Sequence, residues 1–210
     1  SSAGSEISYC LVTSGDAGDD DLTRSNEELA ALREEEQTAA ALAVGVSDLH
    51  WLRYADGRVE NNLLLRRDIT RIIRKIRPDV VVTQPTSANW DRIYGSHPDH
   101  LATAWATMAA VYPDARNPRS HPELLEAGYQ PHLVPEVWMM WMAAPEGTMM
   151  HVDITATFEE KVKALRCHAS QTDRIDGLEA LLHEWASGVA SSADMESGCL
   201  AEGFRVINTE

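Results

Sequence analysis

The stretch RPDVVVTQPTSANWDRIYGSHPDHLATAWATMAAV, residues 77–111, decides the fold prediction. Its unbroken apolar run VVVT, residues 80–83, is typical of a strand that is buried on both faces. A polar loop follows, and the Ala-rich segment 101–111 predicts a helix. In an open α/β sheet, ligands bind at the carboxyl ends of the strands. We therefore expect the loop 84–100 to contain ligand-binding or catalytic residues.

The rest of the chain repeats this alternation of strands and helices, so we expect an α/β fold with a mostly parallel sheet. Ser25 or Asn26 is the expected cap of one helix, and Gly45 is its expected end. The Pro-rich segment 112–135 predicts an irregular excursion that forms a lid or a wall of the substrate cleft. The remaining expectations are strands at 7–13, 49–54, 136–142 and 151–155, and helices at 63–76, 158–168 and 177–186.

The composition limits the classes of function. At 210 residues with 44% apolar content, the chain suits a single domain, residues 1–210, with one core. A formal charge of -15 excludes a nucleic-acid surface and an anionic membrane as partners, because both recruit clustered Lys and Arg. The three cysteines have no disulfide-framework spacing, which favours the cytoplasm. No apolar run is long enough for a membrane span, and the oligomeric state is left open.

The tetrapeptide His97-Pro98-Asp99-His100 carries the clearest chemical signal. Two imidazoles three residues apart at a strand-to-helix junction can approach one ligand from the same side. One can bind Zn²⁺ while the other, protonated and held off the metal, stabilises an oxyanion or acts as an acid. Asp99 can accept a hydrogen bond that fixes the tautomer of a neighbouring imidazole. Taken alone, however, this spacing is more often a helix cap or a surface pair.

Several other polar groups have a plainer interpretation. The acidic run after the first expected strand, from Asp16 to Asp21, is typical of a solvated loop, with a metal cluster as the alternative. Glu34, Glu35 and Glu36 are expected on the wet face of a helix. Cys10 is interpreted as small core filler within a strand. His168 has two interpretations that we rank as equal, a buried structural histidine and a residue lining the site.

The chain resembles the PIG-L (LmbE-like) family of zinc-dependent N-deacetylases over nearly its whole length. The matching segments are ordered: TSGDAG (13–18), LREEE (32–36), YADG (54–57), RPDVVVT (77–83), YGSHPDH (94–100), and finally Asp153, Lys161 and HASQ (168–171). The resemblance implies a Rossmann-like three-layer sandwich. It also implies an amino-terminal AHPDD motif, whose His and second Asp bind zinc and whose first Asp is the general base. That motif does not occur in this chain, so we expect the strand that carries it to be missing.

The resemblance assigns roles to residues by position. His100 matches a ligand of Zn²⁺ or another divalent metal, and His97 matches the group that stabilises the tetrahedral intermediate. Arg33 and Asp56 match substrate-binding residues. Tyr94 matches a mobile active-site tyrosine, although Ser96 adds one residue between it and His97. The candidate catalytic residues are thus His97 and Asp99.

The function predicted from these residues is removal of an acyl group, typically acetyl, from an N-acetylated amino sugar or a glycoconjugate of one. The substrate is then a small molecule. Two alternative functions remain, because the AHPDD motif is missing and the sequence of segment 112–135 does not reveal which substrate the cleft accepts. One is a non-catalytic relative that binds a sugar or a partner. The other is a metal hydrolase that acts on an ester or on a non-sugar amide.

Overall fold

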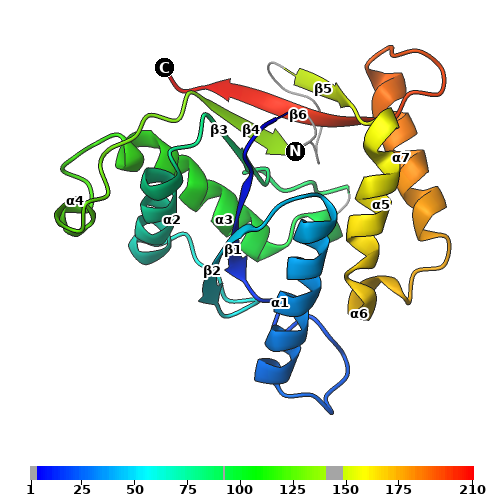
Figure 1. Cartoon of the computed structure of the whole chain (residues 1–210), viewed down its shortest axis with the longest axis horizontal. Coiled ribbons are helices and arrows are strands. Elements are labelled where there is room, and N and C mark those ends of the chain that lie inside the picture. Colours follow the sequence, from blue (N-terminus) through cyan, green and yellow to red (C-terminus); the bar gives the residue numbers. More distant parts are fainter. Residues whose placement is uncertain (1–3, 92, 141–148) are drawn as a thin grey trace. The chain divides into compact units, whose positions relative to one another are not determined.

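The computed structural model describes residues 4–91, 93–140 and 149–210, which pack as two compact units. The first unit comprises residues up to Asp56 together with His151–Gly203, and the second comprises Gly57–Met150 with Phe204–Glu210. Figure 1 shows their helices and strands. The single domain predicted from the length stays a prediction.

The first unit begins with two parallel strands and a long helix. Strand β1 (Ser8–Thr13) pairs with β2 (Asp48–Tyr54), and α1 (Asn26–Ala43) connects them. Ser25 caps α1 with a capping box in which Glu28 is the reciprocal partner, as expected for Ser followed three residues later by Glu. Gly45 follows the helix with a positive φ of 77°, which glycine adopts without strain. The predicted helix start and end are confirmed.

The carboxyl-terminal part of the first unit is mostly helical. It contains β5 (Met149–Asp153), the short turn η3 (Thr155–Thr157), α5 (Phe158–Arg166), α6 (Ala169–Thr172) and α7 (Leu178–Ser192). Helices α5 and α7 lie side by side in Figure 1. Their shared core consists of Phe158, Val162, Leu182, Ala186 and Leu200. Burial of these apolar side chains holds the helices together.

The second unit contains the strand and loop that decided the prediction. Strand β3 (Val80–Thr83) runs parallel to β4 (Glu136–Met140), and β4 runs antiparallel to β6 (Ala201–Asn208). The strand order of this sheet is β3-β4-β6-β5. Its helical elements are α2 (Leu63–Ile76), η1 (Ile93–Gly95), α3 (Pro98–Ala109), η2 (Ala110–Ala115) and α4 (Pro122–Glu126). The α/β class is therefore confirmed, with a mixed sheet.

Several element predictions need correction. The strand β6 was not predicted, because its sequence AEGFRVIN starts after a Gly- and Ser-rich stretch without a clear turn signal. The predicted strand 136–142 is described only as far as Met140, and its last two residues lie outside the described part. The excursion 112–135 is not wholly irregular, since it contains α4 and the end of η2.

Two burial predictions are also wrong. Val82 is 53% exposed although it lies in an unbroken apolar strand, and Cys10 is exposed rather than core filler. Both residues lie on strands at the end of their sheet's order, β3 and β1, so each strand has a described neighbour on one side only. Cys10, Cys167 and Cys199 form no disulfide in the part of the chain that the structure describes.

Within the second unit, Arg74 attaches the Pro-rich excursion to α2. It is 2% exposed, and its guanidinium donates hydrogen bonds to the carbonyl oxygens of Asp114, Ala115, Asn117 and Ser120 at 2.8–3.2 Å. Burial lowers the pKa of this guanidinium, and the negative charges of Asp114 and then Glu123 oppose the shift. One buried cation thus satisfies a run of loop carbonyls.

Replacing this cation tests the attachment. We expect Arg74→Ala to lower the free energy of unfolding by about 3 kcal/mol, since it removes charge-assisted hydrogen bonds and leaves buried carbonyls unpaired. The exposed neighbour Lys75→Ala is the control and is expected to cost less than about 0.5 kcal/mol. Urea unfolding followed by circular dichroism measures both. Equal stability of the two variants would contradict the role of Arg74.

Candidate active site

The histidine pair lies at the start of α3. His97 is the cap residue, Pro98 occupies the first helical turn, and the ring centroids of His97 and His100 are 5.6 Å apart at an angle of 56°. Proline fits the first turn because its missing N–H has no partner to lose there. The predicted proximity of the two imidazoles is confirmed. The cap interpretation also holds, because His97 caps the helix with its own ring.

The cap bond fixes the tautomer of His97. The backbone N–H of Asp99 donates to Nδ1 of His97 at 3.3 Å, so Nδ1 carries no proton while this bond is kept. The remaining proton of a neutral ring is then on Nε2. Nε2–H can therefore donate to a ligand while the cap bond is kept, and the protonated His97 that the sequence predicts stays a prediction.

The carboxylate of Asp99 contacts a turn of the chain. It is 5% exposed and accepts hydrogen bonds from the backbone N–H groups of Gly57, at 2.7 Å, and Val59, at 3.2 Å. Its backbone N–H, rather than its carboxylate, makes the bond to His97. The structure therefore places Asp99 as a positioning residue for the 57–59 turn. A direct catalytic role for Asp99 stays a prediction.

The loop before α3 carries Tyr94 and the additional residue Ser96. Tyr94 is 69% exposed on η1, whereas Ser96 is buried and its Oγ accepts a hydrogen bond from the N–H of Asn89 at 2.8 Å. The extra residue therefore closes the loop onto itself by a hydrogen bond. The assignment of Tyr94 as a substrate-binding residue stays a prediction.

In the first unit, Arg33 and Asp56 converge on Gly18. Arg33 is 9% exposed and donates from Nη2 to the carbonyl of Gly18 at 2.9 Å, while its buried Nε has no partner among the described residues. A methyl carbon placed on Gly18 would lie 3.8 Å from Nη2 of Arg33 and 3.8 Å from Oδ2 of Asp56. The N–H of Asp56 donates to Asp16 at 3.0 Å. This arrangement offers a cation and a carboxylate to one polar ligand.

The prediction that Glu34–Glu36 form a wet face is wrong for Glu36. Glu36 is 8% exposed, and its carboxylate accepts hydrogen bonds from the N–H and Oγ of Ser170 at 2.6 and 2.8 Å. Leu29, Arg33, Glu36 and Ala40 all lie on the buried stripe of α1. Their spacing of three and four residues was the signal that could have identified Glu36.

The acidic run is held by arginines. Asp19 accepts from Arg174 at 3.0 Å and lies 3.6 Å from Arg24, and the guanidinium of Arg174 holds the pKa of Asp19 below its ordinary value. Asp21 accepts from the hydroxyl and N–H of Thr23, which lowers its pKa. These partners favour the loop interpretation over a metal cluster.

The donors in the described part of the chain do not complete a zinc site. A catalytic zinc ion normally has three protein ligands and one open position. Among residues 4–91, 93–140 and 149–210, no group of three or more His, Cys, Asp or Glu side chains is placed to hold a metal ion. The imidazoles of His97 and His100 are therefore an incomplete donor set.

The family model described as PIG-L, GlcNAc-PI de-N-acetylase, matches residues 1–111. The diacetylchitobiose deacetylase of Thermococcus kodakarensis is 32% identical over 169 residues, which are 80% of this chain and 60% of that protein. The chain belongs to the PIG-L family. The Saccharopolyspora erythraea protein named 1D-myo-inositol 2-acetamido-2-deoxy-alpha-D-glucopyranoside deacetylase 2 is 32% identical over 220 residues, with 83% of this chain and 76% of that protein covered.

The fold of this PIG-L chain matches a solved relative closely. The structure of N,N'-diacetylchitobiose deacetylase from Pyrococcus horikoshii superposes with a TM-score of 0.87 at 30% identity, covering 99% of this chain and 74% of that one. The chain spans 60% of the length of the Thermococcus protein.

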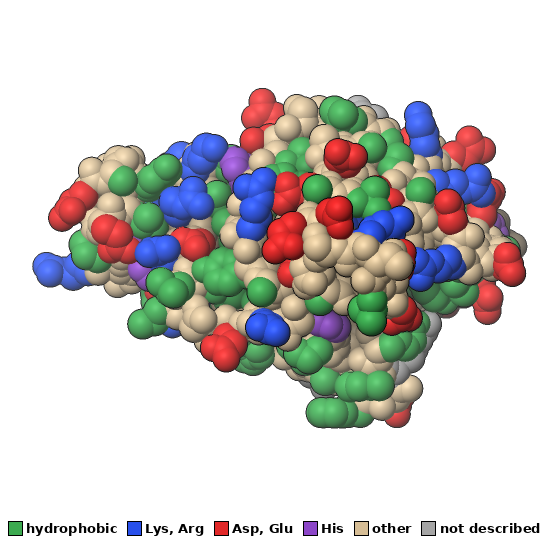
Figure 2. Space-filling model, turned by 90° about the horizontal axis from the view of Figure 1, so that it is seen from below, with side chains coloured by type: hydrophobic (Ala, Val, Ile, Leu, Met, Phe, Trp, Pro, Cys, Tyr) green, Lys and Arg blue, Asp and Glu red, His purple; other side chains and the backbone are tan. Residues whose placement is uncertain are grey.

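The part of the chain that the structure describes contains no helix long and apolar enough to cross a membrane. On the face drawn in Figure 2, acidic and basic side chains are interspersed.

His168 lies beside Glu36 and Arg33 and is half-buried. Burial lowers its pKa below the ordinary value; the Glu36 carboxylate opposes this shift, and the Arg33 guanidinium adds to it. The unfolded chain therefore binds this proton more readily than the folded chain. Stability that depends on His168 is full above the unfolded pKa of about 6.5 and is lost as the pH falls below it.

This linkage gives a measurable pH dependence. Between about pH 6.5 and 5, above the range in which Asp and Glu titrate, we expect the free energy of unfolding to fall with pH. We expect His168→Gln to reduce that slope, and the control His50→Gln to leave the contribution of His168 in place. Urea unfolding at several pH values measures the slopes. If the free energy of unfolding changed with pH equally in His168→Gln and in the unsubstituted chain, the pH dependence could not be assigned to His168.

Proposed function

We propose that the protein is a metal-dependent N-deacetylase that removes acetyl from an N-acetylated amino sugar or from a glycoconjugate of one. The observation that carries this proposal is the pair of imidazoles fixed at the start of α3, with a hydrogen bond that leaves Nε2–H of His97 as a donor. The names of the sugar deacetylases to which the chain is similar support the substrate class.

In this proposal, His97 donates a hydrogen bond to the oxyanion of the tetrahedral intermediate. As the amide carbon becomes tetrahedral, its oxygen gains negative charge, and a fixed N–H donor stabilises that charge more than it stabilises the ground state. The cap bond from Asp99 holds the ring in place, so little reorganisation is needed during the reaction.

Arg33 and Asp56 have the role of sugar-binding residues. The buried Nε of Arg33 has no partner among the described residues, so its N–H can donate a hydrogen bond to a hydroxyl or carbonyl oxygen of the substrate. The carboxylate of Asp56, which also lies close to Gly18, can accept a hydrogen bond from a sugar hydroxyl. A charged donor and acceptor at one place favour a ligand with several hydroxyls.

The metal is part of the proposal. His100 is proposed as one ligand of zinc or another divalent ion. The described residues do not bring together the remaining ligands, so other groups must supply them. A cytoplasmic location and a small amino-sugar substrate are likewise proposed, from the cysteine usage and from the family resemblance.

The incomplete donor set specifically favours a second candidate, a relative that binds a sugar without hydrolysing it. The two candidates differ in one product. A deacetylase releases acetate and a free amine from the ligand that it binds, whereas a binding protein holds the same ligand unchanged.

Acetate release tests the leading candidate. With Zn²⁺ present, we expect release from N,N'-diacetylchitobiose and N-acetylglucosamine to exceed release from N-acetylated aliphatic amines. We expect His97→Ala to lower kcat by about a hundredfold to a thousandfold, as loss of one oxyanion donor does in other acyl-transfer sites. Enzymatic assay of acetate measures the rates.

The control is His50→Ala, a substitution on β2 that removes an imidazole paired with Asp48 and is expected to keep the activity. Saccharide binding without acetate release would favour the binding protein. Faster release from the aliphatic amides than from the sugars would favour a non-sugar amide hydrolase.

A further inference from the structure

His168 has two interpretations from the sequence, a buried structural histidine and a residue lining the site, and its surroundings separate them. The residue is half-buried at the start of α6, and its ring makes no cap bond to that helix. Within the described part of the chain, no hydrogen bond to a ring nitrogen of His168 is present. A structural histidine usually has its ring nitrogens hydrogen-bonded. The ring therefore remains able to bond a ligand.

A hydrogen-bonded link holds this part of the chain against α1. Glu36 is 8% exposed, and its carboxylate accepts from the N–H and Oγ of Ser170 at 2.6 and 2.8 Å. A buried carboxylate is costly without such donors, so the folded chain keeps this link. Ser170 follows His168 by two residues, and Glu36 follows Arg33 by three, which is about one helical turn. The link therefore places His168 beside the stripe of α1 that carries Arg33.

Two charges of α1 act on the ring of His168. Burial lowers the pKa of the ring, the Glu36 carboxylate opposes this shift and the Arg33 guanidinium adds to it, so both side chains lie near the ring. The imidazole is consequently neutral at pH 7, where one ring nitrogen donates a hydrogen bond and the other accepts one. Both nitrogens can then bond to a hydroxylated ligand.

Arg33, on the same buried stripe as Glu36, supplies a second group without a partner. Its Nη2 donates to the Gly18 carbonyl at 2.9 Å, but its buried Nε has no hydrogen-bond partner among the described residues. A buried donor without a partner is costly, and a bound ligand or water usually satisfies it. Two neighbouring groups that both lack hydrogen-bond partners, Arg33 Nε and the His168 ring, indicate a binding site rather than core packing.

The chemistry of this site favours an uncharged, hydroxylated group. Arg33 only donates hydrogen bonds, the Asp56 carboxylate near Gly18 only accepts them, and His168 does both. All three belong to the first unit. The carboxylates of Asp56 and Glu36 repel an anion, which disfavours a phosphate or carboxylate ligand. A pair of hydroxyl groups, in which each oxygen can donate and accept, matches this set.

We propose that His168 is a further ligand-contact residue of the site formed by Arg33 and Asp56, and that Glu36 and Ser170 are the residues that position it. This inference rests on the proposed function, which assigns Arg33 and Asp56 to sugar binding. It adds a residue that determines which hydroxyl groups of the ligand the site accepts.

Binding of N-acetylglucosamine without added metal tests this contact apart from hydrolysis. We expect the sugar to shift the ring resonances of His168 saturably in nitrogen-15 NMR spectra, with the resonances assigned by their loss in His168→Ala. The dissociation constant, measured by calorimetry, should rise about two- to tenfold in His168→Ala, the weight of one neutral hydrogen bond. His168→Phe keeps a ring without nitrogens and should weaken binding equally. Circular dichroism establishes that each variant is folded.

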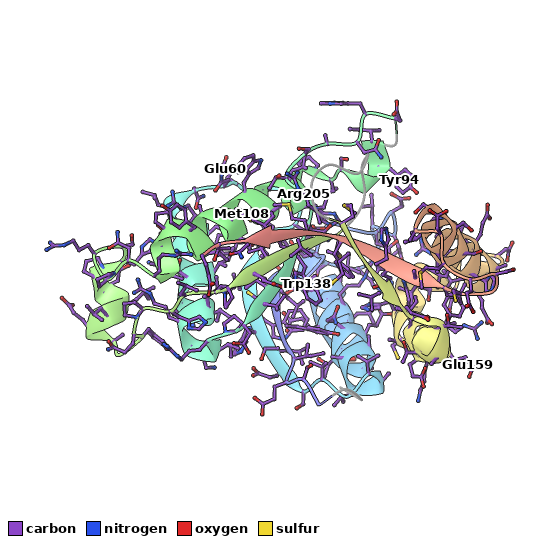
Figure 3. The ribbon with its side chains drawn as sticks, turned by 90° about the horizontal axis from the view of Figure 1, so that it is seen from above. Glu60, Tyr94, Met108, Trp138, Glu159 and Arg205 are labelled. Atoms are coloured by element: carbon purple, nitrogen blue, oxygen red, sulfur yellow. The ribbon has the colours of Figure 1, made fainter. Side chains whose placement is uncertain are left out.

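The role of Glu36 is tested by combining substitutions. Glu36→Gln removes the charge that accepts from Ser170, and we expect it to weaken sugar binding in the unsubstituted chain but to have no further effect in His168→Ala. Glu35→Gln is the matched control, since Glu35 is exposed on the same helix and its substitution should leave the dissociation constant unchanged. Glu159→Gln is a second control, because Glu159 is exposed and lies on the outside of α5 in Figure 3.

Three results would overturn the inference: no saturable shift of the His168 ring, an unchanged dissociation constant in the folded variants of His168, or an equal effect of Glu36→Gln with and without His168. The outcome also separates this inference from the deacetylase proposal. Sugar binding that His168→Ala weakens, without acetate release from any amide when zinc is added, removes the deacetylase only. Acetate release with the same KM in His168→Ala and in the unsubstituted chain removes the His168 contact only.

Discussion

The hydrogen bonds of the Asp99 carboxylate are the constraint on which the second unit's site depends. A buried carboxylate is costly unless donors surround it, and here the backbone N–H groups of Gly57 and Val59 supply them. The carboxylate also lies in the first turn of α3, where the helix dipole favours negative charge. One residue thus joins the turn that follows Asp56 to the helix that carries the histidine pair. Its N–H at the same time fixes the ring of His97.

The same helix carries the histidine pair and part of an apolar groove. His97 and His100 occupy its start, and Trp105 and Met108 line the groove farther along. Arg74 and the ion pair of Arg66 with Asp114 hold the Pro-rich excursion against α2, beside Tyr112 of the groove wall. The excursion was predicted to form a lid or a wall of the cleft. Its role as a lid or a wall stays a prediction.

Much of the fold could be predicted because local signals agreed with one another. The capping box at Ser25, the glycine after α1 and the strand at 80–83 all have local causes that the sequence displays. The exposure of Val82 and Cys10 could not be predicted, because it depends on which elements cover each face of the sheet. The strand β6 was missed because its sequence starts without a clear turn signal, and its pairing with β4 appears only in the folded chain.

The candidate site was predicted in part. The closeness of His97 and His100 follows from their spacing at a helix start, and the structure places them as expected. The partners of Asp99 and Glu36 could not be predicted, because Gly57 is 42 residues from Asp99 and Ser170 is 134 residues from Glu36. Side chains that bond over such separations need the folded chain to identify them. The groove was missed because no local pattern joins Asn62 to Trp105.

The measurement that tests the account most directly is a calorimetric zinc titration of the 210-residue chain, of His100→Ala and of His50→Ala. Because the described residues supply an incomplete donor set, the account predicts weak zinc binding that is lost in His100→Ala and kept in His50→Ala. Zinc binding of equal strength in His100→Ala would contradict it, because the ion would then be held elsewhere.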